Sequence, residues 1–289
     1  MSNTAVKQKK KWSTGKKVAV IVSAVIAVLL VLVIIAGVIA LKWYCKVPEY
    51  QQVKTDKQVT LIAHRGYSSE APENTVPAYI EAGEQGFWGA ECDIYMTKDG
   101  VWVLSHDPVT YRMTGKIDNV EKLTLEELQA QPITNGSNIE DYPDLTTCTL
   151  GDYLQACKDG GMVPVIELKG KNNTEHYDKV VAEVEKYGVE AIYISFQYEN
   201  LQKIRALTDA KVYYLAGEIT DEVIEQAAAL ENCGIDFNAN KEENFESGAL
   251  DKCKEKGLDL AAWTVDDLEL LDKLIDNGVT VITTNCITK

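Results

Sequence analysis

The chain has 289 residues, of which 46% are hydrophobic and 25% are charged, a composition typical of one large globular domain or two small ones. Its formal net charge is −15 at pH 7. Because this charge repels nucleic acid, no nucleic-acid partner is expected, and any phosphate ligand requires a metal ion or a few well-placed cations. The seven cysteines are widely spaced and do not indicate a disulfide framework.

The first predicted element is a charge-free apolar run over residues 18–41. As a helix it is roughly 36 Å long, enough to cross a bilayer with some tilt. Six lysines precede it between positions 7 and 17, so the positive-inside rule predicts a cytoplasmic basic tail (1–17), a transmembrane helix (18–41) and an extracytoplasmic remainder. A cleaved signal peptide is the alternative, but its apolar region is normally shorter and ends in small residues. We therefore expect an uncleaved signal anchor in a single-pass membrane protein.

A polar juxtamembrane linker is expected at residues 42–57. From residue 58 onward, apolar runs alternate with amphipathic segments, which predicts a parallel sheet with helical crossovers. Strands are expected at 59–63, 89–95, 101–105, 163–168, 191–195, 212–215, 235–238, 258–263 and 279–283. Helices are expected at 76–84, 149–158, 176–187, 199–207, 222–230, 248–256 and 268–276.

If the strands at 89–105 count as one unit, the pattern gives a (β/α)₈ TIM barrel over residues 58–289. A doubly wound sheet is the competing α/β architecture, but no GxGxxG sequence follows the first strand. A polar stretch at about 108–147, with one short helix expected at 123–130, interrupts the alternation of strands and helices. We interpret it as a small insertion after the second strand unit.

Polar side chains follow the expected strands where these end, and in a parallel barrel those ends share one face. Glu91 and Asp93 lie two apart on one strand and therefore point the same way, and Glu167 ends another strand. Buried carboxylates repel one another unless a cation pairs with them. Three oxygen ligands suit Ca²⁺ or Mg²⁺. The alternative is a solvated edge, which the apolar neighbours of these residues disfavour.

Two of the three histidines, His64 and His106, also stand at strand ends and form a candidate acid/base pair. The third, His176, opens a polar helix and is expected on the surface. A single strand-end histidine more often has a structural role, so the pair carries the argument. Arg65 either binds a phosphoryl oxygen or pairs with Glu73, and its planar guanidinium favours phosphate.

Two aromatic residues follow strands on the same face. Trp263, before Thr264, either walls a substrate pocket or belongs to the core. Phe196, after Ser195, raises the same question.

Taken together, six short motifs in this order resemble the glycerophosphodiester phosphodiesterase family from about residue 58 to the C-terminus. They are His64-Arg65-Gly66, Pro72-Glu73-Asn74-Thr75, Glu91-x-Asp93, His106-Asp107, Glu167-x-Lys169 and Trp263-Thr264. The resemblance implies a (β/α)₈ barrel, a divalent cation, usually Ca²⁺ or Mg²⁺, and hydrolysis of a glycerophosphodiester to glycerol 3-phosphate and an alcohol. The stretch at 108–147 is similar to the family's insertion after the His-Asp motif.

By the same resemblance, Glu91, Asp93 and Glu167 are expected to bind the metal. His64 and His106 are expected to act as general base and acid, with a cyclic phosphate as the expected intermediate. Arg65 and Lys169 would neutralise the phosphate, and Glu73 would support the metal or the glycerol hydroxyls. Trp263 and Phe196 remain candidates for substrate binding.

Two features depart from the family pattern. The last strand commonly ends in Thr-Asp, whereas this chain has Thr284-Asn285, which leaves a secondary polar contact open. No room remains for a closing eighth helix, and the juxtamembrane segment or the membrane is expected on that flank. Alternative functions are a phosphodiesterase for lysophospholipid or polyglycerol-phosphate polymer, and a surface module without catalysis, which the complete set of polar residues disfavours. The oligomeric state is not indicated.

Overall fold

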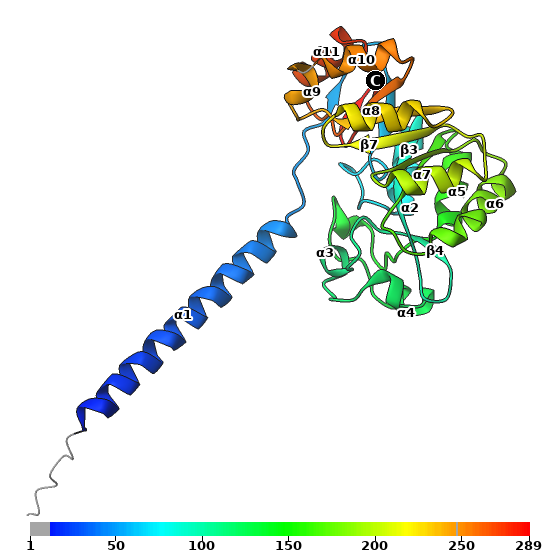
Figure 1. Ribbon diagram of the computed structural model, residues 1–289. Coiled ribbons are helices and arrows are strands. Elements are labelled where there is room, and N and C mark those ends of the chain that lie inside the picture. The colour runs from blue at the N-terminus through cyan, green and yellow to red at the C-terminus, as the bar shows by residue number, and fades with distance from the viewer. Residues whose placement is uncertain (1–11, 247) are drawn as a thin grey trace, which may run out of the picture. The chain divides into compact units, whose positions relative to one another are not determined.

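The computed structural model describes residues 12–246 and 248–289. These fall into two units, one ending at Lys46 and one comprising Val47–Lys289. In the first, α1 (Thr14–Tyr44) is a helix with a mean hydropathy of 3.5 over its most apolar 18 residues and no buried residue (Figure 1). Its length and composition suit a membrane span. It extends beyond the predicted run 18–41 at both ends.

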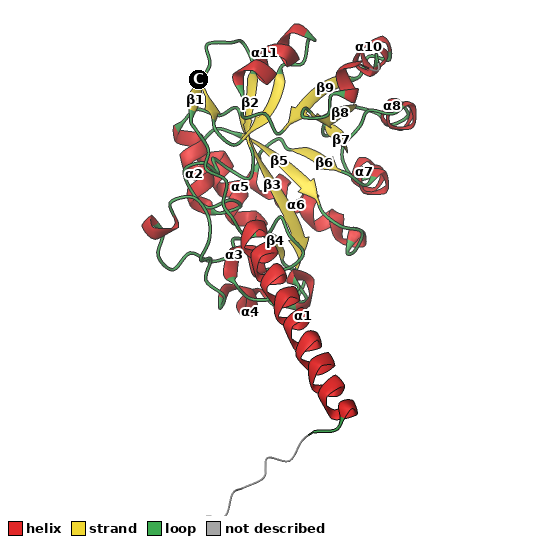
Figure 2. Ribbon diagram, turned by 90° about the vertical axis from the view of Figure 1, so that its left-hand side faces the viewer, coloured by secondary structure: helices red, strands yellow, loops and turns green. Residues whose placement is uncertain are grey.

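The second unit contains a closed parallel barrel, as predicted. Strand β10 pairs with β2 through Ile282 and Leu61, and β2 pairs with β3 through Ile62 and Gly89 (Figure 2). The ring is therefore closed, whereas a doubly wound sheet would have two open edges. In ring order the described strands are β2 (Thr60–Ala63), β3 (Gly89–Met96), β5 (Val163–Leu168), β6 (Ile192–Ser195), β7 (Val212–Ala216), β8 (Cys233–Asn238), β9 (Asp259–Trp263) and β10 (Val281–Thr284).

Amphipathic helices surround the barrel and bury their apolar faces against the strands (Figure 2). Several begin at a side-chain cap: Thr149 forms a capping box with Asp152, and Asp267 accepts from the N–H groups of Glu269 and Leu270. The helices are α2 (Val76–Glu84), α5 (Leu150–Asp159), α6 (Tyr177–Tyr187), α7 (Tyr198–Arg205), α8 (Asp221–Ala228), α9 (Glu243–Glu246), α10 (Ala249–Glu255) and α11 (Leu268–Asp276). The barrel interior is filled by Ile62, Val165, Ile194, Tyr213, Leu215 and Ala261.

The insertion begins after β4 (Trp102–Leu104), which pairs antiparallel with β3. It holds four short helical pieces where the sequence predicted one: α3 (Tyr111–Thr114), η1 (Val120–Lys122), α4 (Leu125–Gln129) and η2 (Ile139–Asp141) (Figure 1). Single turns of this length carry too little periodicity to be recognised in the sequence. Val120 and Leu128 pack on Tyr95 and Val103, which attaches the insertion to β3 and β4.

A separate two-stranded sheet joins the juxtamembrane stretch to the end of the barrel. Strand β1 (Val53–Lys54) runs parallel to β11 (Ile287–Thr288) (Figure 2). The Val53 N–H donates to the Cys286 carbonyl at 3.3 Å, and the Thr55 N–H donates to the Thr288 carbonyl at 2.9 Å. Part of the stretch 42–57 is therefore an element of the barrel unit.

Candidate active site

A left-handed turn ends β2 and begins the site. Arg65 has a φ of 59° and Gly66 a φ of 79°. A Cβ on Gly66 would lie 2.7 Å from the Cβ of Ala78, so the position requires glycine for both its conformation and its space. The turn directs the Arg65 N–H to Glu91 Oε2 at 2.8 Å. The strand therefore stops where its backbone begins to hold a carboxylate of the neighbouring strand.

Three buried carboxylates converge at the carboxyl ends of β3 and β5. Glu91, Asp93 and Glu167 each offer one oxygen, and these oxygens lie within 4.8 Å of one another. Asp93 is the register partner of Glu167 across the two strands. Burial, and then the nearby Asp93 charge, raise the pKa of Glu167 to about 8 and that of Glu91 well above its ordinary value. Ionisation of all three carboxylates would thus place more negative charge here than the surroundings neutralise.

Two cations reach this cluster. Lys169 Nζ lies 3.2 Å from Asp93 Oδ1 and 3.1 Å from Glu167 Oε1. Arg65 Nε lies 3.5 Å from Asp93 Oδ2. Burial alone would raise the pKa of Asp93, but Lys169 and Arg65 lower it overall. Asp93 is therefore the ionised member of a cluster in which Glu91 and Glu167 hold protons more tightly.

Arg65 also pairs with Glu73 at 2.9 Å, which is one of the two alternatives that the sequence left open. The same carboxylate accepts from Arg112 at 2.7 and 2.9 Å. Burial opposes ionisation of Glu73, but Arg65 and Arg112 lower its pKa to about 2. Glu73 is thus a fixed anion that orients Arg65 at the rim of the cluster.

His64 is held by a chain of hydrogen bonds. Its Nδ1 lies 2.8 Å from Asn285 Oδ1, which also accepts from Ser68 Oγ at 2.8 Å, and Asn285 Nδ2 donates to Asp266 Oδ2 at 2.7 Å. These partners fix the amide orientation, so the Nδ1 of the imidazole must be the donor. Burial, and then the Arg65 charge, lower the pKa of His64 to about 4. The neutral ring keeps a free electron pair on Nε2. Asn285 thus makes the polar contact that the sequence left open.

His106 has a different partner. Its Nδ1 lies 3.0 Å from Asp107 Oδ1, and Asp107 Oδ2 accepts from Arg112 at 2.6 Å. Asp107 is itself held by Arg112, so a carboxylate, not an amide, fixes the orientation of the His106 ring. Both histidines contribute to the electrostatics of Asp93 and Glu73, so the two rings belong to one site. The third histidine, His176, lies on a surface turn beside Glu175.

Phe196 and Trp263 meet at the end of β6 and β9. Their ring centroids are 5.5 Å apart at an interplanar angle of 86°. Trp263 Nε1 donates to the Asp236 carbonyl at 3.2 Å, and Phe196 is 42% exposed. The pair gives this side of the barrel mouth an apolar wall.

The sequence reasoning assigned no role to several residues that support the site. Asn74 Nδ2 donates to Asp93 Oδ2 at 2.8 Å, and Asn74 Oδ1 accepts from the Asp93 N–H at 3.2 Å. Because Asn74 lies in the Pro-Glu-Asn motif, the sequence could have indicated that it belongs to the site. Arg112 and Asp266 carried no such signal, because one lies in the irregular insertion and the other in a loop whose path only the fold defines.

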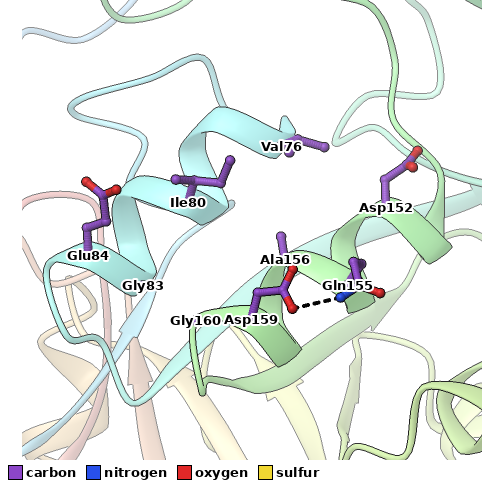
Figure 3. Close-up of a pocket in the computed structure, with 9 residues that line it drawn as sticks. All are labelled: Val76, Ile80, Gly83, Glu84, Asp152, Gln155, Ala156, Asp159 and Gly160. Atoms are coloured by element: carbon purple, nitrogen blue, oxygen red, sulfur yellow. Dashed lines mark hydrogen bonds between the residues drawn. The ribbon is translucent and has the colours of Figure 1, made fainter.

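A hollow of about 540 Å³ beside α2 and α5 is not this site. Figure 3 shows it lined by residues of those helices, among them Glu84, Asp152 and Asp159, and none of the predicted site residues contributes to it. Its acidic lining, with Gln155 donating to Asp159, offers no cation for a phosphate.

The chemistry of the donor set fits a hard divalent cation. Its ligands are carboxylate oxygens alone, which suit Ca²⁺ and Mg²⁺ and not softer metals. In addition, Asp93 Oδ1 is buried and accepts no hydrogen bond, although the Lys169 ammonium lies 3.2 Å away as an ion-pair partner. A bound cation would satisfy this oxygen and relieve the repulsion that raises the pKa values of Glu91 and Glu167.

Known proteins are similar to this chain in sequence and in architecture. Glycerophosphodiester phosphodiesterase 1 of Homo sapiens is 32% identical over 158 residues, which cover 54% of this chain and 48% of the human protein. The chain thus spans about half the length of that relative. A glycerophosphodiester phosphodiesterase of Caldanaerobacter subterraneus subsp. tengcongensis is 29% identical over 238 residues, 78% of this chain and 93% of the relative.

Among solved structures, a phosphodiesterase of Oleispira antarctica in complex with the product sn-glycerol-3-phosphate superposes with a TM-score of 0.70 at 26% identity, covering 78% of this chain and 92% of that one. The model of the glycerophosphoryl diester phosphodiesterase family matches residues 64–289, from the first site histidine to the last residue. The chain belongs to the glycerophosphoryl diester phosphodiesterase family.

Proposed function

We propose that this protein hydrolyses small glycerophosphodiesters to sn-glycerol 3-phosphate and an alcohol. The observation that carries the proposal is the buried three-carboxylate cluster flanked by two imidazoles with different partners. The family membership and the product bound to the Oleispira phosphodiesterase support it.

In this proposal Glu91, Asp93 and Glu167 hold a divalent cation, Ca²⁺ or Mg²⁺. When bound, that ion supplies positive charge against the phosphoryl oxygens as the reaction proceeds. Lys169 and Arg65 add charge on the same side, and Glu73 keeps Arg65 in place. The protein thereby offsets the negative charge that develops on the phosphoryl group.

The two histidines would divide the proton transfers. The neutral Nε2 of His64 accepts the proton of the glycerol 2-hydroxyl, whose oxygen then forms a bond to phosphorus. The bond from phosphorus to the leaving alcohol breaks, and His106, whose ring is oriented by Asp107, gives that oxygen its proton as the general acid. A cyclic phosphate results. Water then opens it: His106 takes a proton from the water, and His64 returns its proton to the 2-hydroxyl oxygen.

A second candidate keeps this chemistry with larger substrates, lysophospholipid or polyglycerol-phosphate polymer. Helix α1 favours it, because an apolar anchor keeps an enzyme near lipid and envelope material. In this proposal residues 1–17, which lie mostly outside the described residues, face the cytoplasm, and residues 58–289 form an extracytoplasmic catalytic domain. Turnover of lysophosphatidylcholine above that of glycerophosphocholine would favour the larger substrate.

The test uses the full chain in detergent with Ca²⁺ or Mg²⁺ and measures release of sn-glycerol 3-phosphate from glycerophosphocholine and glycerophosphoethanolamine. We expect His64→Ala and His106→Ala each to lower kcat by about 10²–10⁴-fold. His176→Ala is the matched control and should leave the rate unchanged. No release from any diester, or rates unaffected by both site substitutions, would contradict the proposal and favour a binding module.

A further inference from the structure

The insertion after β4 contributes a charged side chain to the active site, Arg112 of α3. Its Nε donates to Asp107 Oδ2 at 2.6 Å, and its two Nη atoms donate to the two oxygens of Glu73 at 2.7 and 2.9 Å. The side chains of Arg112, Glu73 and Asp107 are 16%, 18% and 14% exposed, so salt screens these ion pairs less than pairs on the open surface. Arg112 thus joins the loop after β2 to the loop after β4.

Each of these carboxylates holds a residue that has a role in the proposed reaction. Asp107 Oδ1 lies 3.0 Å from His106 Nδ1, which leaves Nε2 as the nitrogen that can face the leaving alcohol. Glu73 Oε1 accepts from Arg65 at 2.9 Å as well as from Arg112 at 2.7 Å. A continuous series of polar contacts therefore runs from the proposed general acid to the guanidinium proposed to neutralise the phosphate, and Arg112 is its middle member.

The contacts of Arg112 indicate that it acts through these partners and not on the substrate itself. Its Nε and both Nη atoms are directed at carboxylates, so a phosphoryl oxygen would have to compete with two anions for them. The insertion fixes the other end of the residue, because the Arg112 carbonyl accepts from Asn135 Nδ2 at 2.8 Å. The insertion is in turn bonded to the loop after β2, where Ser137 Oγ donates to the Ser68 carbonyl at 2.6 Å.

Loss of the Arg112 guanidinium would change both carboxylates. Asp107 would lose the charged donor that fixes its second oxygen, so this carboxylate and the His106 ring would be free to turn together. Glu73 would have both oxygens free for Arg65, whose charge the protein would then neutralise in place of the phosphate. A lysine at position 112 has the charge but not the planar fork, so it would not reach both carboxylates at once.

We infer that Arg112 is a positioning residue that, through Asp107, aligns His106 for protonation of the leaving alcohol and, through Glu73, keeps Arg65 available to the phosphate. The insertion thereby completes the catalytic unit of the barrel. This inference rests on the proposed function, which it deepens by one residue outside the motifs that the sequence indicated.

The leaving alcohol provides the first test. Choline needs a proton to leave, whereas p-nitrophenolate leaves without one. In the full chain with Mg²⁺ in detergent, Arg112→Lys should lower kcat for glycerophosphocholine by about 10–100-fold, and for the p-nitrophenyl ester of glycerol 3-phosphate at least about fivefold less. Arg112→Gln is the second variant, with the same expectation if the lysine protein does not fold. Equal losses for the two esters, or no loss for either, would overturn the inference.

Two control substitutions accompany this test. Arg205→Lys changes a half-buried arginine of α7 that donates to the carbonyls of Thr208 and Ala210. Ser137→Ala removes a bond between the insertion and the Ser68 carbonyl, and so controls for looser docking of the insertion. Both should leave kcat unchanged for both esters. A loss of kcat in Ser137→Ala equal to that in Arg112→Lys would show a structural role alone and overturn the inference.

A double-mutant cycle provides the second test, because a structural effect would persist in any background. In the His106→Ala protein no ring remains to be aligned, so Arg112→Lys should lower kcat for glycerophosphocholine at least about fivefold less than in the wild type. In the His176→Ala protein the loss should be as large as in the wild type. Equal losses in the two backgrounds would overturn the inference.

Binding separates a failure of this inference from a failure of the proposed function. By isothermal titration calorimetry with Mg²⁺, Arg112→Lys should weaken sn-glycerol 3-phosphate binding about tenfold, the loss of one hydrogen bond to a charged group. If this weakening occurs but the wild type hydrolyses no diester, the proposed function alone is contradicted. If the wild type hydrolyses diesters and Arg112→Lys changes neither binding nor kcat, the inference alone is contradicted. A wild type that neither binds nor hydrolyses overturns both.

Discussion

Asn285 determines which nitrogen of His64 is free to act. Its amide is held by Ser68 and Asp266, and its oxygen accepts from the imidazole. Asn285→Ala would remove that acceptor and let the ring turn or change tautomer. We expect kcat to fall by at least about tenfold, as for other residues that orient a functional ligand. The rate of sn-glycerol 3-phosphate release measures this.

Asn277→Ala is the control for that substitution. Asn277 follows α11 and donates to the Lys273 carbonyl, away from the carboxyl ends of the strands. Its replacement should leave kcat unchanged. If Asn285→Ala is as active as this control, Asn285 does not position His64.

The neutral state of the half-buried His64 ring predicts a dependence of stability on pH. Its pKa is about 4 in the folded protein, against an ordinary 6.5, so between these values the unfolded chain binds more protons. The contribution of His64 to stability is complete above pH 6.5 and is lost as the pH falls toward 4. Urea unfolding of the chelated protein at pH 7 and pH 5 measures this loss.

His64→Gln should reduce the loss between the two pH values, whereas His176→Gln should not. An equal loss in wild type and His64→Gln would show that the ring is not buried in its neutral form.

At the scale of elements, β1 is the least expected part of the fold. Val53→Pro would remove the N–H that donates to Cys286 and should lower the free energy of unfolding by about 1–2 kcal/mol. Lys54→Pro is the matched control, since the exposed Lys54 N–H donates no bond to β11. Equal effects of both substitutions on the free energy of unfolding would contradict a specific role for the pairing.

The barrel strands and helices could be predicted because their periodicity is local. Helices α2 (Val76–Glu84) and α11 (Leu268–Asp276) have the predicted bounds, since turn residues and caps mark their ends. For the strand predicted at 279–283, the predicted start was wrong by two residues: β10 begins at Val281. Such boundaries depend on which residues find a partner across the sheet, which the sequence does not contain.

His64, Glu167 and Trp263 could be recognised because each stands at the end of a strand, and parallel strands bring such ends together. Strand β1 could not, since two residues have no detectable period and their partner lies at the other end of the chain. The same holds for Arg112, whose contacts with Glu73 and Asp107 join segments that are distant in sequence. Long-range polar contacts need the fold before they can be named.

For the whole molecule, the proposed topology separates the tail from the catalytic unit by one membrane. The charge-free part of α1 suits a span, and the lysines before it favour a cytoplasmic N-terminus. We expect the full chain to remain in membranes after alkaline carbonate extraction. An epitope on the C-terminus should be digested by protease added outside intact cells or spheroplasts, and an epitope on the N-terminus should be protected. The reverse pattern, or release by carbonate, would contradict this topology.

The most direct test of the central claim is the rate of sn-glycerol 3-phosphate release from glycerophosphocholine after chelation and stepwise return of Ca²⁺ or Mg²⁺. If Glu91, Asp93 and Glu167 hold a cation needed for hydrolysis, EDTA should abolish release and the added metal should restore it. Glu167→Gln should need about 10–100-fold more metal for the same rate. Release that persists under EDTA, or a Glu167→Gln protein with the wild-type metal dependence, would contradict the claim.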